Sequence, residues 1–148
     1  MIVNADDLPG LSGPVAMVDG GFDPLHAGHI AYFAAAAQLG VPVLCNLTPD
    51  GWIERKHPPL LPQHERAAVI DAIRHIAYTH PSRTSTRDVL AALRPRFYVK
   101  GADWRGRLPE EERETCRELG VEIVYLDTVT NSSSAVLRDY LGRHAAIG

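Results

Sequence analysis

The stretch that decides the fold is Gly20-Gly21-Phe22-Asp23-Pro24-Leu25-His26-Ala27-Gly28-His29-Ile30. It follows a short apolar run that ends at Asp19 and predicts a buried strand, and it leads into an alanine-rich segment that predicts a helix. Two histidines, His26 and His29, therefore fall where this helix begins, on either side of Gly28. Backbone N–H groups at the start of a helix are unpaired and attract anions. The stretch thus predicts a polyphosphate site at a strand-to-helix turn.

The composition of the whole chain is that of an ordinary globular protein. Its 148 residues are 45% hydrophobic and 22% charged, and the formal net charge is −3. The length predicts a single domain over residues 1–148, with residues 1–14 as an irregular lead-in. Because Lys and Arg form no run, we expect no nucleic-acid partner. Because no apolar run approaches ~20 residues and no signal peptide is evident, we expect no membrane segment and a cytoplasmic location.

Strand and helix patterns alternate along the chain after the lead-in. The predicted strands are residues 15–19, 41–47, 76–79, 97–99 and 121–126, and the predicted helices are residues 28–39, 63–75, 88–93, 109–119 and 135–141. This order predicts an α/β, Rossmann-like fold with a five-stranded parallel sheet and helices on both faces. We expect Thr86 to cap the third helix, Asn131 and Ser132–Ser134 to cap the last, and Thr48–Pro62 to form a long polar loop.

The loops that follow the strands carry the residues of chemical interest. In parallel sheets of this kind, ligands bind at the carboxyl ends of the strands, where the strand order reverses. The loops at residues 20–29, 48–62, 101–108 and 127–134 all follow predicted strands. We therefore expect these loops to converge on one edge of the sheet.

Three interpretations compete for His26 and His29. The two side chains could cap and pack the helix, or they could begin a metal site, although two histidines are incomplete and no HExxH arrangement is present. Alternatively, protonated or N–H-donating imidazoles could hold phosphate oxygens and stabilise the charge of an in-line displacement. We favour phosphate binding. The rival functions are a nucleotide-binding module without turnover and a metal-dependent hydrolase.

The segment Gly21–His29 resembles the HxGH signature of the cytidylyltransferase-like nucleotidyltransferases. Pro62-Gln63-His64-Glu65-Arg66 is similar to the segment that opens the second helix of that family. Tyr98–Trp104 resembles the Val-Lys-Gly-Gly-Asp-Tyr stretch of heptose-1-phosphate adenylyltransferases and the Gly-Asp-Asp-Trp of glycerol-3-phosphate cytidylyltransferases. Ser132–Ser134 is similar to the serine and threonine group that begins the family's last helix. The four motifs follow one another in the family's order.

The resemblance implies a reaction and a role for each matching residue. A phosphate oxygen of a phosphorylated sugar, polyol or similar small molecule attacks the α-phosphorus of CTP or ATP, and pyrophosphate leaves. His26, His29 and Lys56 are implied to be catalytic, and Arg66 and Arg55 to bind the acceptor. Nucleotide binding is implied for a larger set: Gly21, Phe22, Gly28, Lys100, Gly101, Asp103, Trp104, Ser132, Ser133 and Ser134. The resemblance further implies Mg²⁺ held mainly by the NTP phosphates, no metal ligands from the chain, and a homodimer.

Two loops depart from the patterns of these relatives. The glycerol-3-phosphate enzymes carry an Arg-Thr-Glu-Gly stretch before the last helix, whereas Asp127–Asn131 contains no arginine. The stretch Arg55-Lys56-His57-Pro58-Pro59 matches the Lys-Gly-x-x-Arg-Pro loop of the heptose enzymes only loosely. The Val-Lys-Gly segment favours ATP and Trp104 favours CTP, so the sequence leaves both the donor and the acceptor open.

Overall fold

The computed structural model of the chain describes all residues except 12, 128–132 and 146–148, and the side chains of residues 144 and 145. The strands are β1 (Ala16–Gly20), β2 (Val43–Leu47), β3 (Tyr78–Pro81), β4 (Phe97–Gly101) and β5 (Glu122–Leu126). The α-helices are α1 (Ala27–Ala37), α2 (Asp50–Ile53), α3 (Gln63–Asp71), α4 (Thr86–Leu93), α5 (Glu110–Leu119) and α6 (Ser133–Ala145), and the 3-10 helices are η1 (Ala5–Gly10) and η2 (Ala102–Trp104).

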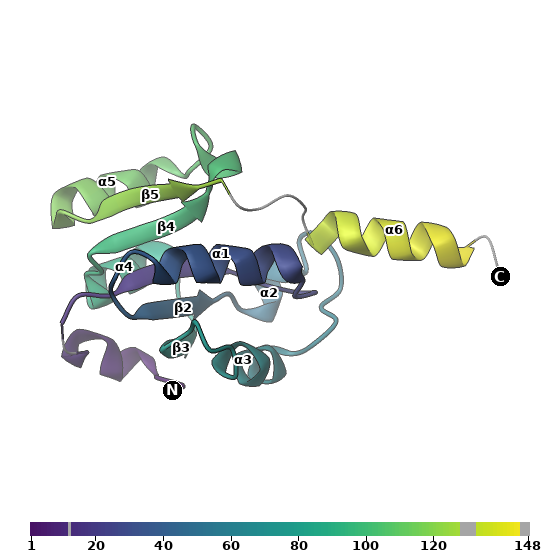
Figure 1. Cartoon of the computed structure of the whole chain (residues 1–148), viewed down its shortest axis with the longest axis horizontal. Coiled ribbons are helices and arrows are strands. Elements are labelled where there is room, and N and C mark those ends of the chain that lie inside the picture. Colours follow the sequence, from purple (N-terminus) through teal and green to yellow (C-terminus); the bar gives the residue numbers. More distant parts are fainter. Residues whose placement is uncertain (12, 128–132, 146–148) are drawn as a thin grey trace.

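The strands of the described residues form one parallel sheet in the order β3-β2-β1-β4-β5 (Figure 1). The carboxyl ends of parallel strands lie at one edge, and the chain order reverses at β1, which has β2 on one side and β4 on the other. The predicted Rossmann-like fold is therefore confirmed. Its topological switch point lies between the carboxyl ends of β1 and β4, which is where such sheets bind ligands.

Helices cover both faces of the sheet. On one face, α1 and α3 pack through Phe33 and Ile70, and on the other face α4 packs through Leu90 beside η1 and α5. Successive side chains of a strand point to opposite faces, so that Val18 joins the first core and Met17 joins the second. Both cores are buried, which is why the strands read as nearly continuous apolar runs.

The sheet opens between β1 and β4 at its carboxyl edge. The paired residues of these two strands end at Val18 and Val99, whereas β1 stays paired with β2 as far as Gly20, and β4 stays paired with β5 as far as Gly101. At this point the Tyr32 hydroxyl of α1 donates a hydrogen bond to the Val99 carbonyl. The fold thus separates the two strands at its switch point.

Two segments expected to be irregular contain helices. The lead-in, residues 1–14, includes η1, which is capped by Asn4 and buries Leu8 against the α4 face of the sheet. The predicted polar loop Thr48–Pro62 includes α2, which buries Ile53. Both predictions were wrong because a short helix with one buried residue shows no helical periodicity in the sequence.

Several boundaries also differ from the prediction. Ser85, and not Thr86, caps α4: its hydroxyl accepts the N–H of Asp88 at 3.2 Å, and Thr86 is the first helical residue. The ladder with β2 places β3 two residues later than predicted, and α3 ends four residues earlier. The predicted caps Asn131 and Ser132 lie outside the described residues. Among the described helices, none is long and apolar enough to cross a membrane.

Candidate active site

The two histidines close the first turn of α1. His26 is the N-cap residue, and its Nδ1 accepts the backbone N–H of Gly28 at 3.1 Å. The Nδ1 of His29 accepts the backbone N–H of His26 at 3.3 Å, so the two side chains form a reciprocal capping box. Their rings stack with centroids 3.8 Å apart. Capping and ligand binding therefore do not exclude each other here, because capping uses only one nitrogen of each ring.

The protonation of both rings follows from these contacts. Burial lowers the pKa of His26, and burial together with the neighbouring His26 lowers the pKa of His29 to about 4. Both rings are therefore neutral near pH 7, and because each Nδ1 accepts a hydrogen bond, the ring proton lies on Nε2. The Nε2 of His26 is buried and has no hydrogen-bond partner among the described residues. The site thus offers two Nε2–H donors rather than two positive charges.

Glycines around the start of α1 lie where a Cβ atom would be crowded. A Cβ atom on Gly28 would lie 2.8 Å from Cε1 of His26, and a Cβ atom on Gly21 would lie 3.0 Å from a side-chain atom of α2. Between them, Phe22 adopts the left-handed backbone conformation with φ of 51°, and its ring meets His29 edge-on at 4.9 Å between centroids. These contacts set the position of the histidines relative to α2.

The side chain of Arg66, for which the sequence predicts an acceptor contact, is buried and bonded within the protein. It is 1% exposed, and its Nη2 pairs with Asp50 at 2.6 Å. Its Nε donates to the carbonyl of Leu61, and its Nη1 donates to the carbonyls of Gly21 and Thr48. Because these donors are used within the protein, Arg66 braces α2 against the turn before α1, and an acceptor would have to displace internal hydrogen bonds to reach it.

Arg55 and Lys56 follow α2 and are both exposed. The Arg55 guanidinium lies over the ring of Trp52, 4.4 Å from its centroid. Lys56 forms no ion pair within the described part of the chain. The predicted loop Thr48–Pro62 contains α2, which follows the carboxyl end of β2 and lies against Gly21. The structure therefore brings Arg55 and Lys56 to the same edge of the sheet as the histidines, as predicted.

The residues predicted on the nucleotide side end β4 and form η2. The Nζ atom of Lys100 lies 3.8 Å from Oδ2 of Asp19 and 4.3 Å from the centroid of the Trp104 ring. Gly101 is buried and Asp103 is exposed. Lys100 thus reaches across the opening from β4 to Asp19, which lies one strand residue before the turn that leads to the histidines.

The predicted serines begin α6. The Ser133 hydroxyl donates to the carbonyl of Pro24 at 2.8 Å, which brings the start of α6 to the turn before α1. Ser134 is half-buried beside it, and Ser132 lies outside the described residues. Apart from Ser132, the predicted site residues therefore lie on the segments around the carboxyl ends of β1, β2 and β4 and at the start of α6.

Sequence reasoning missed Asp19. Its Oδ1 accepts the side-chain amide of Asn46 at 2.9 Å, and its Oδ2 accepts the hydroxyl of Thr86 at 3.1 Å. An acidic residue at the end of an otherwise apolar buried strand was the available signal, since Asp is seldom buried unless it is paired.

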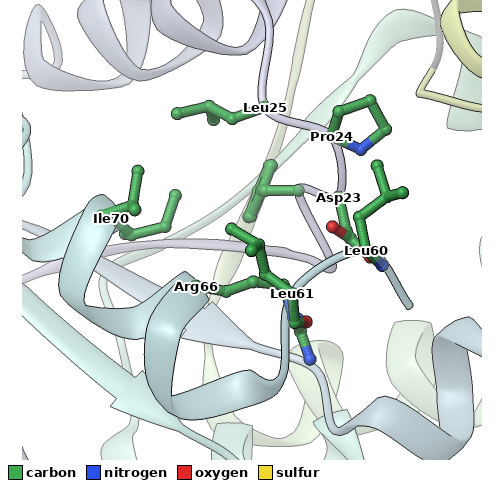
Figure 2. A pocket seen from close by; sticks show the side chains of 9 residues that line it. Asp23, Pro24, Leu25, Leu60, Leu61, Arg66 and Ile70 are labelled. Carbon is green, nitrogen blue, oxygen red and sulfur yellow. The ribbon is translucent and has the colours of Figure 1, made fainter.

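An apolar cavity of about 240 Å³ lies beside the turn before α1. Figure 2 shows Leu25, Leu60 and Ile70 around it, with Asp23 in its wall. Oδ2 of Asp23 accepts the N–H of Leu60 at 2.7 Å, so the only carboxylate of the wall is already bonded. The full lining is Phe22, Asp23, Pro24, Leu25, Leu60, Leu61, Arg66, Val69 and Ile70. This lining does not suit a polyphosphate, which needs several donors.

The chain matches known proteins over most of its length. The family model described as cytidylyltransferase-like matches residues 17–138. Among curated relatives, the bifunctional protein HldE of Aeromonas hydrophila is 36% identical over 101 residues, which are 66% of this chain and 21% of that protein. The D-beta-D-heptose 1-phosphate adenylyltransferase of Bordetella bronchiseptica is 33% identical over 106 residues, which are 68% of this chain and 65% of that protein. The chain thus spans about a fifth of the length of the bifunctional relatives it matches.

A solved structure shows the same fold. The lipopolysaccharide core biosynthesis protein of Thermoplasma volcanium superposes with a TM-score of 0.67 at 22% sequence identity. The match covers 78% of this chain and 97% of the chain of that protein. The matched residues 17–138 begin in β1 and end in α6. They include the two histidines at the start of α1 and Lys100 at the end of β4. This chain belongs to the cytidylyltransferase-like family.

Proposed function

We propose that this protein is a nucleotidyltransferase that transfers the nucleotidyl group of an NTP to a phosphorylated sugar or polyol and releases pyrophosphate. The observation that carries the proposal is the pair of neutral histidines at the start of α1, whose Nδ1 atoms cap the helix and whose Nε2–H groups remain as donors. Family membership supports the same chemistry, as does the heptose 1-phosphate adenylyltransferase among the relatives.

The reaction needs stabilisation of charge rather than a covalent intermediate. An oxygen of the acceptor phosphate attacks the α-phosphorus, the bond from the α-phosphorus to the bridging oxygen breaks, and pyrophosphate leaves with the electron pair. Negative charge grows on the oxygens around the α-phosphorus and on the leaving group. The Nε2–H groups of His26 and His29 would donate to these oxygens, and the exposed ammonium of Lys56 would attract the triphosphate.

The relatives also favour particular substrates. One of them is named as an adenylyltransferase acting on D-beta-D-heptose 1-phosphate, so we propose ATP as the donor and a sugar 1-phosphate as the acceptor class. The sequence departs from the heptose pattern in the stretch Arg55–Pro59, and this loop lies at the carboxyl edge of the sheet. We therefore propose that this loop selects the sugar.

Mg²⁺ would enter this site with the nucleotide. Within the described residues, no group of three or more His, Cys, Asp or Glu side chains could hold a metal ion. Following the resemblance, we propose that the phosphates of the NTP are the main ligands of Mg²⁺, which commonly keeps few protein ligands. The homodimer and the cytoplasmic location remain proposals that rest on the resemblance and on the sequence.

Pyrophosphate release tests the proposal. The purified protein is incubated with Mg²⁺, each of the NTPs in turn, and a panel of sugar 1-phosphates, sugar phosphates and polyol phosphates. We expect release that requires both substrates, is fastest with ATP and a sugar 1-phosphate, and yields a nucleoside diphosphate sugar by mass spectrometry. Calorimetric binding of an NTP without release across the whole panel would instead show a nucleotide-binding module without turnover.

A further inference from the structure

A buried ion pair crosses the opening at the switch point of the sheet. Asp19 and Lys100 each come one residue after the last paired residues of β1 and β4, which are Val18 and Val99. The side chain of Asp19 is 9% exposed and that of Lys100 is 8% exposed. The pair therefore spans the two strands at the place where they separate, on the face of the sheet covered by α4 and α5.

The ammonium of Lys100 has unused hydrogen-bonding capacity. It lies 3.8 Å from Oδ2 of Asp19, which is ion-pair distance but too long for a hydrogen bond. Its other neighbours are the rings of Trp104 at 4.3 Å and Tyr98 at 5.8 Å. None of its three N–H groups has a hydrogen-bond partner among the described residues. The Nζ atom is not among the fully buried polar atoms that lack a partner in the described residues, so these N–H groups can donate to water or to a ligand at the opening.

The carboxylate of Asp19, in contrast, is held from several sides. Asn46 of β2 donates to Oδ1 at 2.9 Å, and Thr86 at the start of α4 donates to Oδ2 at 3.1 Å. The Tyr98 hydroxyl lies 3.4 Å from Oδ2 but has a shorter contact, 2.6 Å, with Glu112. The carboxylate is thus a fixed point, and in the described part of the chain Lys100 is its only ion-pair partner.

We propose that Asp19 is a positioning residue, which holds the ammonium of Lys100 in the opening between β1 and β4 so that its free N–H groups face a phosphate of the bound nucleotide. This inference rests on the proposed function, because it takes the nucleotide as the ligand at the switch point. It assigns Asp19 no contact with the nucleotide: the carboxylate acts through Lys100. The flexible four-carbon stem of lysine explains why such a partner is needed, since an unrestrained ammonium would sample many positions.

A double-mutant cycle tests this assignment. Wild type, Asp19→Asn, Lys100→Met and the double variant are compared for ATP affinity by calorimetry and for the KM values of ATP and the acceptor. We expect Asp19→Asn and Lys100→Met each to weaken ATP binding about tenfold, and the double variant to bind ATP no more weakly than Lys100→Met alone. The KM of the acceptor should be unchanged. Asp6→Asn, at an exposed position in η1, is the matched control.

The possible outcomes separate the two proposals. If the wild-type protein binds no NTP and releases no pyrophosphate, both the proposed function and the assignment of Asp19 are wrong. If wild type is active but Asp19→Asn binds ATP as wild type does or more tightly, or if the two effects add, only the assignment of Asp19 is overturned. A merely structural defect would lower the active fraction without changing the dissociation constant of the remaining protein.

A second variant covers the case in which Asp19→Asn does not fold. Thr86→Val removes the hydroxyl that bonds Oδ2 and keeps the carboxylate charge. We expect ATP binding to weaken two- to threefold in the presence of Lys100 and to be unchanged in the Lys100→Met background. Equal weakening in both backgrounds would contradict a role exerted through Lys100.

Discussion

At the scale of single residues, the two ring nitrogens of each histidine at the start of α1 are available for different functions. The Nδ1 atoms of His26 and His29 complete the start of α1, and their Nε2–H groups are left for a ligand. The structural interpretation and the phosphate-binding interpretation of the motif are therefore compatible. They can also be separated experimentally, because other side chains can cap a helix without offering a second donor.

Replacing His26 by Asn separates capping from catalysis. Asn is among the best N-cap residues, so its side-chain oxygen can take over the bond to the N–H of Gly28, and we expect the free energy of unfolding to stay within about 0.5 kcal/mol of wild type. The Nε2–H donor is lost, and we expect kcat to fall about 100-fold. Urea unfolding and pyrophosphate release measure the two effects. Normal turnover by this variant would remove the proposed role of His26.

The low pKa of His29 predicts a dependence of stability on pH. The ring binds a proton less readily when folded, with a pKa of about 4, than when unfolded, with the ordinary value of 6.5. Its contribution to stability is therefore complete above pH 6.5 and is lost as the pH falls toward 4. The difference in unfolding free energy between wild type and His29→Asn should shrink over this range. An NMR titration of His29 with a midpoint near 6.5 would contradict the prediction.

At the scale of elements, α2 is positioned by a side chain from α3. Arg66 binds Asp50 at the start of α2, the carbonyl of Thr48 just before α2, and the carbonyl of Gly21 in the turn before α1. The four-residue helix is too short to be stable by itself, so its place depends on this brace and on the burial of Ile53. The same brace places Arg55 and Lys56, which follow α2.

Replacing Arg66 by Met should therefore destabilise the fold. The substitution keeps much of the side-chain volume but leaves three carbonyl oxygens without their donors, and we expect a loss of about 3 kcal/mol in the free energy of unfolding. Arg74→Met, at an exposed position shortly after α3, is the matched control and should change it by less than about 0.5 kcal/mol. Equal stability of the two variants in urea would show that Arg66 does not brace the loop.

At the scale of the whole molecule, segments from four parts of the chain meet at one edge of the sheet. Three of them follow β1, β2 and β4, and the fourth is the start of α6; the order β3-β2-β1-β4-β5 places the first and third side by side at the switch point. A nucleotide bound there would contact several elements together. Its binding should therefore stabilise the native state as a whole.

ATP should raise the thermal midpoint of unfolding. At a concentration about 100 times its dissociation constant, a ligand of the native state adds about 2.7 kcal/mol, which for a chain of this size corresponds to a shift on the order of 5–10 °C. Differential scanning fluorimetry with Mg²⁺ and increasing ATP measures the shift. At the same ATP concentration, the Lys100→Met variant should show a smaller one. A shift of equal size in both proteins would argue against Lys100 as a nucleotide contact.

The sequence by itself determined the alternation of strands and helices, the parallel sheet and the place of His26 and His29 at the start of a helix. These features depend on hydrophobic periodicity and on turn residues within a few positions of one another. Short elements with one buried residue, such as α2, were missed because they lack such a period. Capping by the histidines was one of the alternatives that the sequence left open, and the structure shows that their side chains form a reciprocal capping box.

Only the tertiary structure decided which charges become partners. Asp19 and Lys100 are far apart in the chain and meet because β4 lies beside β1, and Arg66 turns inward because carbonyls from two loops converge on it. The strand order that produces these contacts cannot be predicted from any local pattern of the sequence. The partner of a buried charge follows from which strands become neighbours, and that is settled when the whole sheet packs between its two layers of helices.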